Sequence, residues 1–236
     1  MDDYQFIITT DIANIPTNRQ IVMLDGTVPK WSPKPGDIHH DHHRPGGAPI
    51  QLYEIDWERV IERLKPDAVF VSTLLDADAI CSTAACIVAQ KWGIDDFLYG
   101  RTEEVVKLEA ISWDCDHLAV PAYMSYYVCG EELNVYEEFA QKAVMALKQS
   151  SSHLAKSMGL PTNRSDWTPE QKLGFYSRAF KQSVEWIVAA IQGERPWPGE
   201  SGEADEYVEN MNRQYPVVAA NCSWYRGCAI FDQRIF

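Results

Sequence analysis

Short apolar runs alternate with longer amphipathic segments through the first half of the chain. The runs at residues 5–10 (QFIITT), 19–24 (RQIVML) and 68–73 (AVFVST) predict β-strands, and the last is almost continuously apolar, as in buried parallel strands. Residues 57–64 and 80–92 predict helices that end before Pro66 and Gly93. This succession predicts an α/β fold with a mostly parallel sheet flanked by helices.

The second half of the chain has a helical pattern. Residues 134–156 contain few helix breakers, and Thr168-Pro169-Glu170-Gln171 forms a capping box with proline at the first helical position. The apolar residues that follow recur at helical spacing, which is typical of a core-facing stripe: Leu173, Tyr176, Phe180, Val184, Ile187, Val188 and Ile191. Residues 216–236 predict two short strands around Trp224-Tyr225-Arg226-Gly227.

These patterns divide the chain into two parts. Residues 1–130 form the predicted α/β domain. Residues 131–236 form a mainly helical appendage with short C-terminal strands, either as a separate unit or as part of the same domain. An open apolar edge of the sheet would also permit a homodimer.

The charge and composition narrow the classes of function. The net charge is -13 and no Lys/Arg run occurs, so we expect no long nucleic acid as partner, since nucleic-acid affinity comes largely from phosphate neutralisation. No apolar run is long enough to span a bilayer, so no membrane is expected. The acidic N-terminus lacks the pattern of a signal peptide, which favours a cytoplasmic protein. The six cysteines contain no C-x-x-C pair.

Four of the six histidines fall within residues 39–43, where they surround Asp41. Neutral imidazole is a good ligand for divalent transition metals. In an extended segment His40 and His42 would share one face, whereas His39, Asp41 and His43 would share the other. The alternative is a solvated polar loop without a metal. We predict His40, Asp41 and His42 as metal ligands.

Carboxylates follow the predicted strands. Asp25 follows the second strand, Asp76 and Asp78 follow the buried third strand, and Asp114 and Asp116 follow residues 105–112, which we interpret as strand-like. In parallel sheets the functional residues collect at the carboxyl ends of the strands, so we expect these five aspartates at one metal site. The alternatives are that Asp78 caps the following helix and that Asp25 is a turn residue.

This ligand set indicates a particular chemistry. A site built from histidine and aspartate without cysteine suits Mn²⁺ or Mg²⁺ better than structural Zn²⁺. Two such ions can polarise a phosphoryl group, activate a water molecule and stabilise the leaving oxygen. We therefore expect two metal ions and a phosphorylated substrate.

The same residues resemble a known family. Asp41-His42-His43-Arg44 resembles the signature of the DHH phosphoesterase superfamily, and residues 21–25 followed by 37–47 are similar to its paired second and third motifs. The resemblance implies that Asp25 bridges two metals, that His42 is a ligand, and that His43 and Arg44 face the substrate phosphate as catalytic residues. Residues 69–85 look like the first motif, which would assign its aspartates to Asp76 and Asp78. Asp114 or Asp116 would supply the metal-binding aspartate of the fourth motif.

The resemblance covers roughly the first half of the chain and departs from the family pattern. The likeness to the first motif follows the DHH motif instead of preceding it, as in a permuted member, and Ser72 stands where the family has a histidine. Alternatively, residues 76–85 match a later family segment that supports the fold without binding metal. The glycine-rich histidine motif of the usual C-terminal substrate domain is not found.

The function predicted from the sequence is a metal-dependent phosphoesterase that hydrolyses a small phosphorylated substrate of the nucleotide, short-oligonucleotide or pyrophosphate type. The first alternative is a degenerate, non-catalytic protein that binds a metal or nucleotide, as Ser72 would suggest. The second is a single-metal hydrolase or oxygenase that uses two histidines and one carboxylate.

Overall fold

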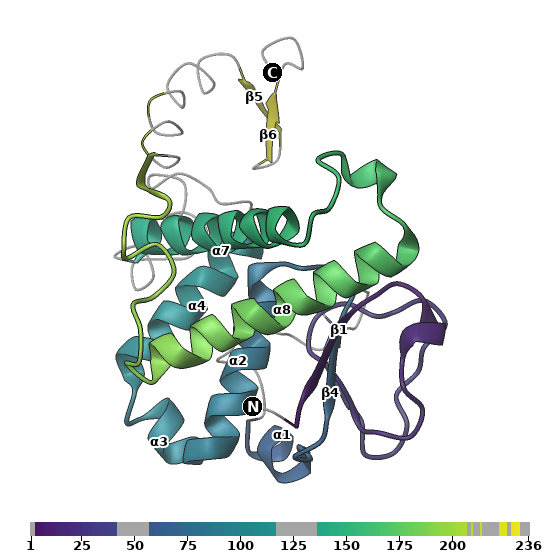
Figure 1. The fold of residues 1–236 in the computed structure, drawn as a ribbon. Helices are drawn as coiled ribbons and strands as arrows, with labels where there is room; N and C mark the ends of the chain where they lie inside the picture. Colours follow the sequence, from purple (N-terminus) through teal and green to yellow (C-terminus); the bar gives the residue numbers. More distant parts are fainter. Residues whose placement is uncertain are drawn as a thin grey trace.

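A four-stranded parallel sheet forms one side of the molecule (Figure 1). The computed structural model describes residues 3–41, 57–116, 136–206, 209, 213, 222–225 and 228–231. The strands are β1 (Gln5–Ile8), β2 (Ile21–Met23), β3 (Ile38–His39) and β4 (Val69–Ser72), in the order β1-β4-β2-β3. Each neighbouring pair is parallel, so all four carboxyl ends lie at the same edge of the sheet.

Alternate residues of the strands enter different clusters of buried residues. Phe6 and Phe70 stack in the larger cluster, which continues into the helices. Ile7 and Val71 point into a smaller cluster on the other face, where Trp31 from the loop between β2 and β3 covers them. The apolar character of both faces explains why these strands appear as continuous apolar runs in the sequence.

The helices pack mainly against the larger cluster. They are α1 (Trp57–Arg63), α2 (Ala77–Trp92), α3 (Ile94–Leu98), α4 (Thr102–Asp116), α7 (Glu137–Ser157) and α8 (Pro169–Ile191), with short 3-10 turns η1 (Ile12–Asn14) and η3 (Arg164–Asp166). α2 is the central helix, because its first thirteen residues are all buried and it packs against α1, α4 and α8. Figure 1 shows α8 crossing over this group beside β1.

Two features of the second half match the sequence pattern. The predicted capping box is present: Thr168 Oγ1 accepts from the Gln171 N–H, and Gln171 Oε1 accepts from the Thr168 N–H. β5 (Cys222–Tyr225) and β6 (Cys228–Phe231) form an antiparallel pair around residues 226–227, as expected. The predicted α/β fold, with its helical second half and short C-terminal strands, is therefore confirmed.

Residues 105–112 differ from the sequence-based interpretation, because they belong to α4 and not to a strand. Val105, Leu108 and Ile111 are spaced three residues apart, which places them on one side of a helix. Glu103 and Glu104 occupy its first turn, where carboxylates interact favourably with the helix dipole. Asp114 and Asp116 consequently lie in the last turn of a helix, not after a strand.

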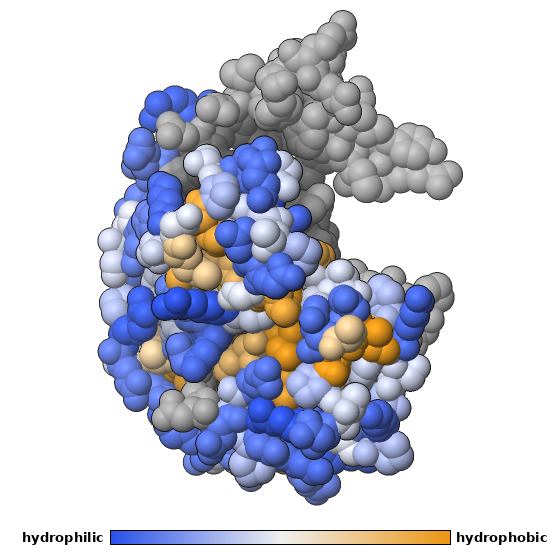
Figure 2. Space-filling view, turned by 45° about the vertical axis from the view of Figure 1, so that its right-hand side comes forward, coloured by the Kyte–Doolittle hydropathy of each residue, from blue (hydrophilic) through white to orange (hydrophobic). Residues whose placement is uncertain are grey.

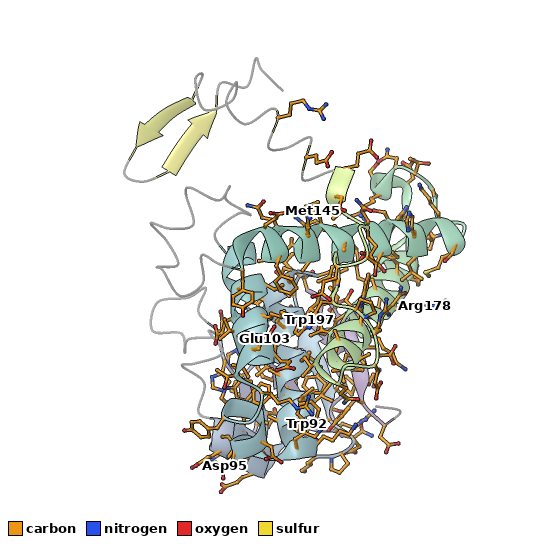
Figure 3. All side chains as sticks on the ribbon, turned by 90° about the vertical axis from the view of Figure 1, so that its left-hand side faces the viewer. Trp92, Asp95, Glu103, Met145, Arg178 and Trp197 are labelled. Carbon is orange, nitrogen blue, oxygen red and sulfur yellow. The ribbon has the colours of Figure 1, made fainter. Side chains whose placement is uncertain are left out.

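The connector after α8 folds back onto α4. Glu103 and Trp197 lie close together in Figure 3, and Lys107 joins them: its Nζ is 3.2 Å from Glu103 Oε1 and 5.7 Å from the centre of the Trp197 ring. A cation held between a carboxylate and an aromatic ring modestly stabilises the packing of this connector on α4. Within the described ranges, none of the helices combines the length and apolarity needed to cross a membrane.

Candidate metal centre

The carboxyl ends of β2 and β4 carry three aspartates. Asp25 lies two residues beyond the last residue of β2, and Asp76 and Asp78 lie in and just after the loop that connects β4 to α2. β2 and β4 are hydrogen-bonded neighbours, with Ile21 opposite Val69. The parallel pairing therefore brings residues that are about fifty positions apart in the sequence to the same point of the sheet edge.

One oxygen atom from each of these aspartates lies within 4.8 Å of the others. Asp25 and Asp78 are almost completely buried, with 1% and 2% of their surface exposed, and Asp76 is half-buried. Carboxylates gathered in a poorly solvated place repel one another, and a bound cation would relieve this repulsion. Oxygen donors alone suit a hard cation such as Mg²⁺ or Mn²⁺.

Asp76 is oriented toward the cluster and not toward the helix. It stands at the N-cap position of α2, but its side chain makes no capping hydrogen bond. Its Oδ1 is shielded from solvent and has no hydrogen-bond partner among the described residues. A buried carboxylate oxygen normally has a partner, so this atom fits a cation ligand. The alternative in which Asp78 caps α2 is wrong, because Asp78 lies in the first turn of the helix.

The two loops that carry the aspartates are in close contact. Gly26 has a φ angle of +65°, and a Cβ atom at this position would lie 2.6 Å from Thr73 Oγ1. Ser72 shapes the second loop, because its Oγ donates to the Leu74 carbonyl oxygen at 2.9 Å and accepts from the Leu74 N–H at 3.3 Å. Ser72 thus forms a local turn that leads the chain toward Asp76.

His39 of the edge strand β3 and Asp41, two residues beyond that strand, both contact Thr27 in the loop that follows β2. The Thr27 hydroxyl donates to Asp41 Oδ2 and lies 3.0 Å from His39 Nε2. The His39 ring also packs edge-on against Trp31, with ring centres 5.2 Å apart. His39 and Asp41 therefore converge on the same residue, in agreement with the prediction that they share one face of an extended segment.

The remaining predicted residues stand as follows. His40 continues the pairing of β2 and β3, because its N–H donates to the Met23 carbonyl oxygen at 2.9 Å. Neither His40 nor Asp41 belongs to the three-carboxylate cluster. For Asp114 and Asp116 the structure describes only the helical backbone. His42, His43 and Arg44 lie outside the described residues, and their assigned roles stay predictions.

Gly26, Thr27 and Thr73 contribute to the site although the sequence alone indicates no role for them. Gly26 and Thr73 define how the two loops approach, and Thr27 fixes Asp41. The segment Leu24-Asp25-Gly26-Thr27 does contain a signal, because a glycine shortly after a strand is typical of a tight turn or a close approach of the backbone. The partners of these residues come from distant segments and are not indicated by that pattern.

Comparison of the chain with protein-family models, with curated proteins and with solved structures gives no match.

Proposed function

We propose that this protein is a metal-dependent phosphoesterase whose metal centre contains Asp25, Asp76 and Asp78. The observation that carries the proposal is the convergence of these three carboxylates at the carboxyl edge of a parallel sheet. The unpartnered Asp76 oxygen supports a cation at this place. Three oxygen donors and no thiolate favour Mn²⁺ or Mg²⁺, and we expect two ions.

The role of the protein in this reaction is to position charge. Asp25 is buried just after β2 and Asp78 is buried in the first turn of α2, and Asp76 reaches the same point from the N-cap position of that helix. Bound metal ions supply polarisation of the phosphoryl oxygens and activation of a water molecule. The first turn of α2 faces this region with its N–H groups, which favours a phosphate anion beside the carboxylates.

A permuted relationship to the DHH phosphoesterases is part of the proposal. Its support is that the aspartates assigned by resemblance to two different motifs, Asp25 on one side and Asp76 and Asp78 on the other, form one cluster. His42 would then add a ligand, and His43 and Arg44 would bind the substrate phosphate. We propose a small phosphorylated substrate of the nucleotide, short-oligonucleotide or pyrophosphate type, acted on in the cytoplasm.

The test is a Mn²⁺ binding measurement by electron paramagnetic resonance, combined with a Mn²⁺-supplemented assay on bis(p-nitrophenyl) phosphate, a mononucleotide, a dinucleotide and pyrophosphate. The Asp25→Asn and Asp76→Asn variants should lose both Mn²⁺ binding and hydrolysis. The matched control is Asp95→Asn, because Asp95 is an exposed aspartate in the first turn of α3 and lies outside the cluster. This control should behave like the wild type.

The possible outcomes separate the alternatives. Failure of the wild type to bind Mn²⁺ or Mg²⁺ would overturn the proposed metal centre. Mn²⁺ binding that depends on Asp25 and Asp76, without hydrolysis of any of the four substrates, would establish the non-catalytic alternative instead. A His42→Ala variant adds a test of the family resemblance, because that variant should lose hydrolysis if His42 is a ligand.

A further inference from the structure

A cavity of about 850 Å³ opens beside the metal centre. Its floor is the carboxyl edge of β1 and β4, including Thr9 and Thr73, and its walls come from α7, η3 and α8. Asp76 lines the cavity and also belongs to the carboxylate cluster, so the two sites are contiguous. The volume lies within the roughly 300–1,000 Å³ that is usual for small-molecule sites.

Three cations line this cavity: Lys148 from α7, Arg164 from η3 and Lys172 from α8. Among the described residues, no carboxylate forms an ion pair with any of them. In contrast, Lys107 and Lys142 each lie within ion-pair distance of two carboxylates. In a chain with a net charge of -13, three cations left without carboxylate partners around one cavity favour an anionic ligand.

Part of the cavity wall is apolar. Leu75, Leu173 and Tyr176 line it, together with Leu74, which is 60% exposed. A leucine with this exposure next to other apolar side chains is typical of a binding surface. On the face drawn in Figure 2, apolar surface lies in a hollow between hydrophilic margins, as expected of such a lining.

Two carboxylates limit where an anion can bind in the cavity. Asp76 belongs to the metal centre, and Asp11 accepts a hydrogen bond from the Ala13 N–H at the start of η1. Both lie near the carboxyl ends of the strands, whereas the three cations come from the second half of the chain. A ligand therefore meets positive charge on the helical wall and the carboxylates at the sheet edge.

We propose that this cavity binds a small organic anion that carries an apolar or aromatic group. Lys148, Arg164 and Lys172 hold the anionic group, while Leu74, Leu173 and Tyr176 contact the apolar part. This arrangement places the ligand next to Asp76, so an organic phosphoester is the substrate class for the metal centre; this last step rests on the proposed function. Inorganic phosphate and pyrophosphate, which lack an apolar part, are poorer ligands.

The test is isothermal titration calorimetry with 1-naphthyl phosphate, compared with inorganic phosphate and with neutral 1-naphthol, first in EDTA and then with Mn²⁺. Wild-type protein should bind 1-naphthyl phosphate at least about tenfold more tightly than either fragment, since both halves of the cavity contribute. The triple variant Lys148→Gln/Arg164→Gln/Lys172→Gln should lose on the order of tenfold in affinity for 1-naphthyl phosphate.

The matched control is Lys156→Gln/Arg178→Gln/Lys181→Gln. It removes the same number of charges from α7 and α8 at residues that do not line the cavity, and Arg178 is labelled in Figure 3. This control should retain the wild-type affinity. A second variant, Leu74→Asn, removes an exposed apolar side chain, so this variant should fold. It should have a lower affinity for 1-naphthyl phosphate and an unchanged affinity for inorganic phosphate.

Equal affinity of wild type for 1-naphthyl phosphate and inorganic phosphate would overturn the proposal, as would unchanged binding in the cavity triple variant. The metal proposal is tested separately in the same titrations. If 1-naphthyl phosphate binding in EDTA depends on the three cations but Mn²⁺ does not bind, the ligand site stands and the phosphoesterase proposal falls.

Discussion

Gly26 lies directly against Thr73, and this contact joins the loop that carries Asp25 to the loop that carries Asp76. A Cβ atom at Gly26 would be 2.6 Å from Thr73 Oγ1 and 3.7 Å from its Cβ, and Gly26 adopts a φ angle of +65°. Both the space and the backbone conformation at this position therefore require glycine. The distance between the two loops, and with it the spacing of the carboxylates, depends on the absence of a side chain at Gly26.

We expect the Gly26→Ala substitution to weaken metal binding without touching a ligand. The new methyl group must displace the Thr73 side chain, and we expect the loop before Asp76 to shift away from Asp25 with it. Loss of support behind metal ligands typically lowers metal affinity by about 10–100-fold, and we expect a loss of this order for Mn²⁺. The accompanying destabilisation should be about 1–3 kcal/mol, measured by chemical denaturation in EDTA.

Gly36→Ala is the matched control for this prediction. Gly36 also has a positive φ angle, +96°, but a Cβ atom there would meet no atom within 4 Å. It therefore reproduces the backbone strain without the collision. If Gly26→Ala and Gly36→Ala bind Mn²⁺ equally well, the contact with Thr73 does not set the geometry of the carboxylate cluster.

The carboxylate cluster should lower the stability of the metal-free protein. We expect Asp76→Asn to be more stable than the wild type in EDTA by about 0.5–2 kcal/mol, because it removes one charge from a group of three. The loss of a favourable interaction with the α2 dipole, about 0.3–1 kcal/mol, opposes this gain but is smaller than the repulsion from two buried carboxylates. Urea denaturation in EDTA measures the difference.

Addition of Mn²⁺ should make the wild type more stable than Asp76→Asn, which is the reverse of the order expected in EDTA. The wild type should gain stability as the ion binds the folded state, whereas Asp76→Asn should gain little. Asp95→Asn, an exposed change in the first turn of α3, should stay within about 0.5 kcal/mol of the wild type under both conditions. A metal-free Asp76→Asn protein that is less stable than the wild type would contradict the prediction.

The sheet edge could be predicted from the sequence because each of its parts is encoded locally. The strands around Val22 and Phe70 are apolar runs, and Asp25, Asp76 and Asp78 follow them within a few residues. The rule that functional residues collect at the carboxyl ends of parallel strands then places these aspartates together. The structure confirms the strands, and it brings these three residues to one point.

The strand predicted at residues 105–112 is wrong for a physical reason. The segment VVKLEAIS contains apolar and polar residues in short succession, and such a run fits both a strand and a helix when it is considered alone. The helix is favoured by tertiary packing, since Leu108 and Ile111 are buried in the same cluster as α2. The placement of Asp114 and Asp116 after a strand depends on this interpretation and is wrong, whereas their link to the fourth motif of the DHH family depends on the resemblance and stays a prediction.

The cavity beside Asp76 could not be predicted from any local pattern. Lys148 and Lys172 look like ordinary surface residues of amphipathic helices, and Leu173 is part of a regular apolar stripe. Their meeting depends on how α7 and α8 pack on the end of β1, which is a relationship between segments about 140 or more residues apart. The contact of Gly26 with Thr73 depends on tertiary structure in the same way.

The turn at Gly199 should be sensitive to any side chain. Gly199 has a φ angle of +86°, and a Cβ atom there would lie 2.7 Å from the carbonyl carbon of Lys142 in α7. Because that neighbour is helix backbone, it cannot move aside easily. We expect Gly199→Ala to destabilise the protein by roughly 2–4 kcal/mol, from backbone strain and overpacking together, as measured by denaturant unfolding.

Gly159→Ala separates the two contributions. Gly159 follows the end of α7 with a φ angle of +67°, but the space around it is open. Alanine at this position should lower the free energy of unfolding only through backbone strain, by about 1–2 kcal/mol. Equal destabilisation by Gly159→Ala and Gly199→Ala would show that the approach to Lys142 has no energetic consequence.

The capping box of α8 links helix stability to the ionisation of Glu170. The Glu170 backbone N–H and the Thr168 hydroxyl both donate to its carboxylate and lower the pKa of Glu170 below its ordinary value of 4.5, with a small opposing effect of desolvation. The lowered pKa means that the folded protein prefers the charged form. This contribution to stability is present above the unfolded-state pKa and is lost as the pH falls through the folded-state pKa.

We therefore expect Thr168→Ala to have two effects. It should destabilise the protein by about 1 kcal/mol through loss of the cap to the Gln171 N–H, and it should raise the pKa of Glu170 toward its ordinary value. The destabilisation should be larger at neutral pH than below the Glu170 pKa.

Denaturation at both pH values and an NMR titration of the Glu170 carboxyl measure these two effects. The control is Thr168→Ser, which keeps the hydroxyl and should resemble the wild type. A Glu170 pKa that is the same in Thr168→Ala and Thr168→Ser would show that the hydroxyl does not interact with this carboxylate.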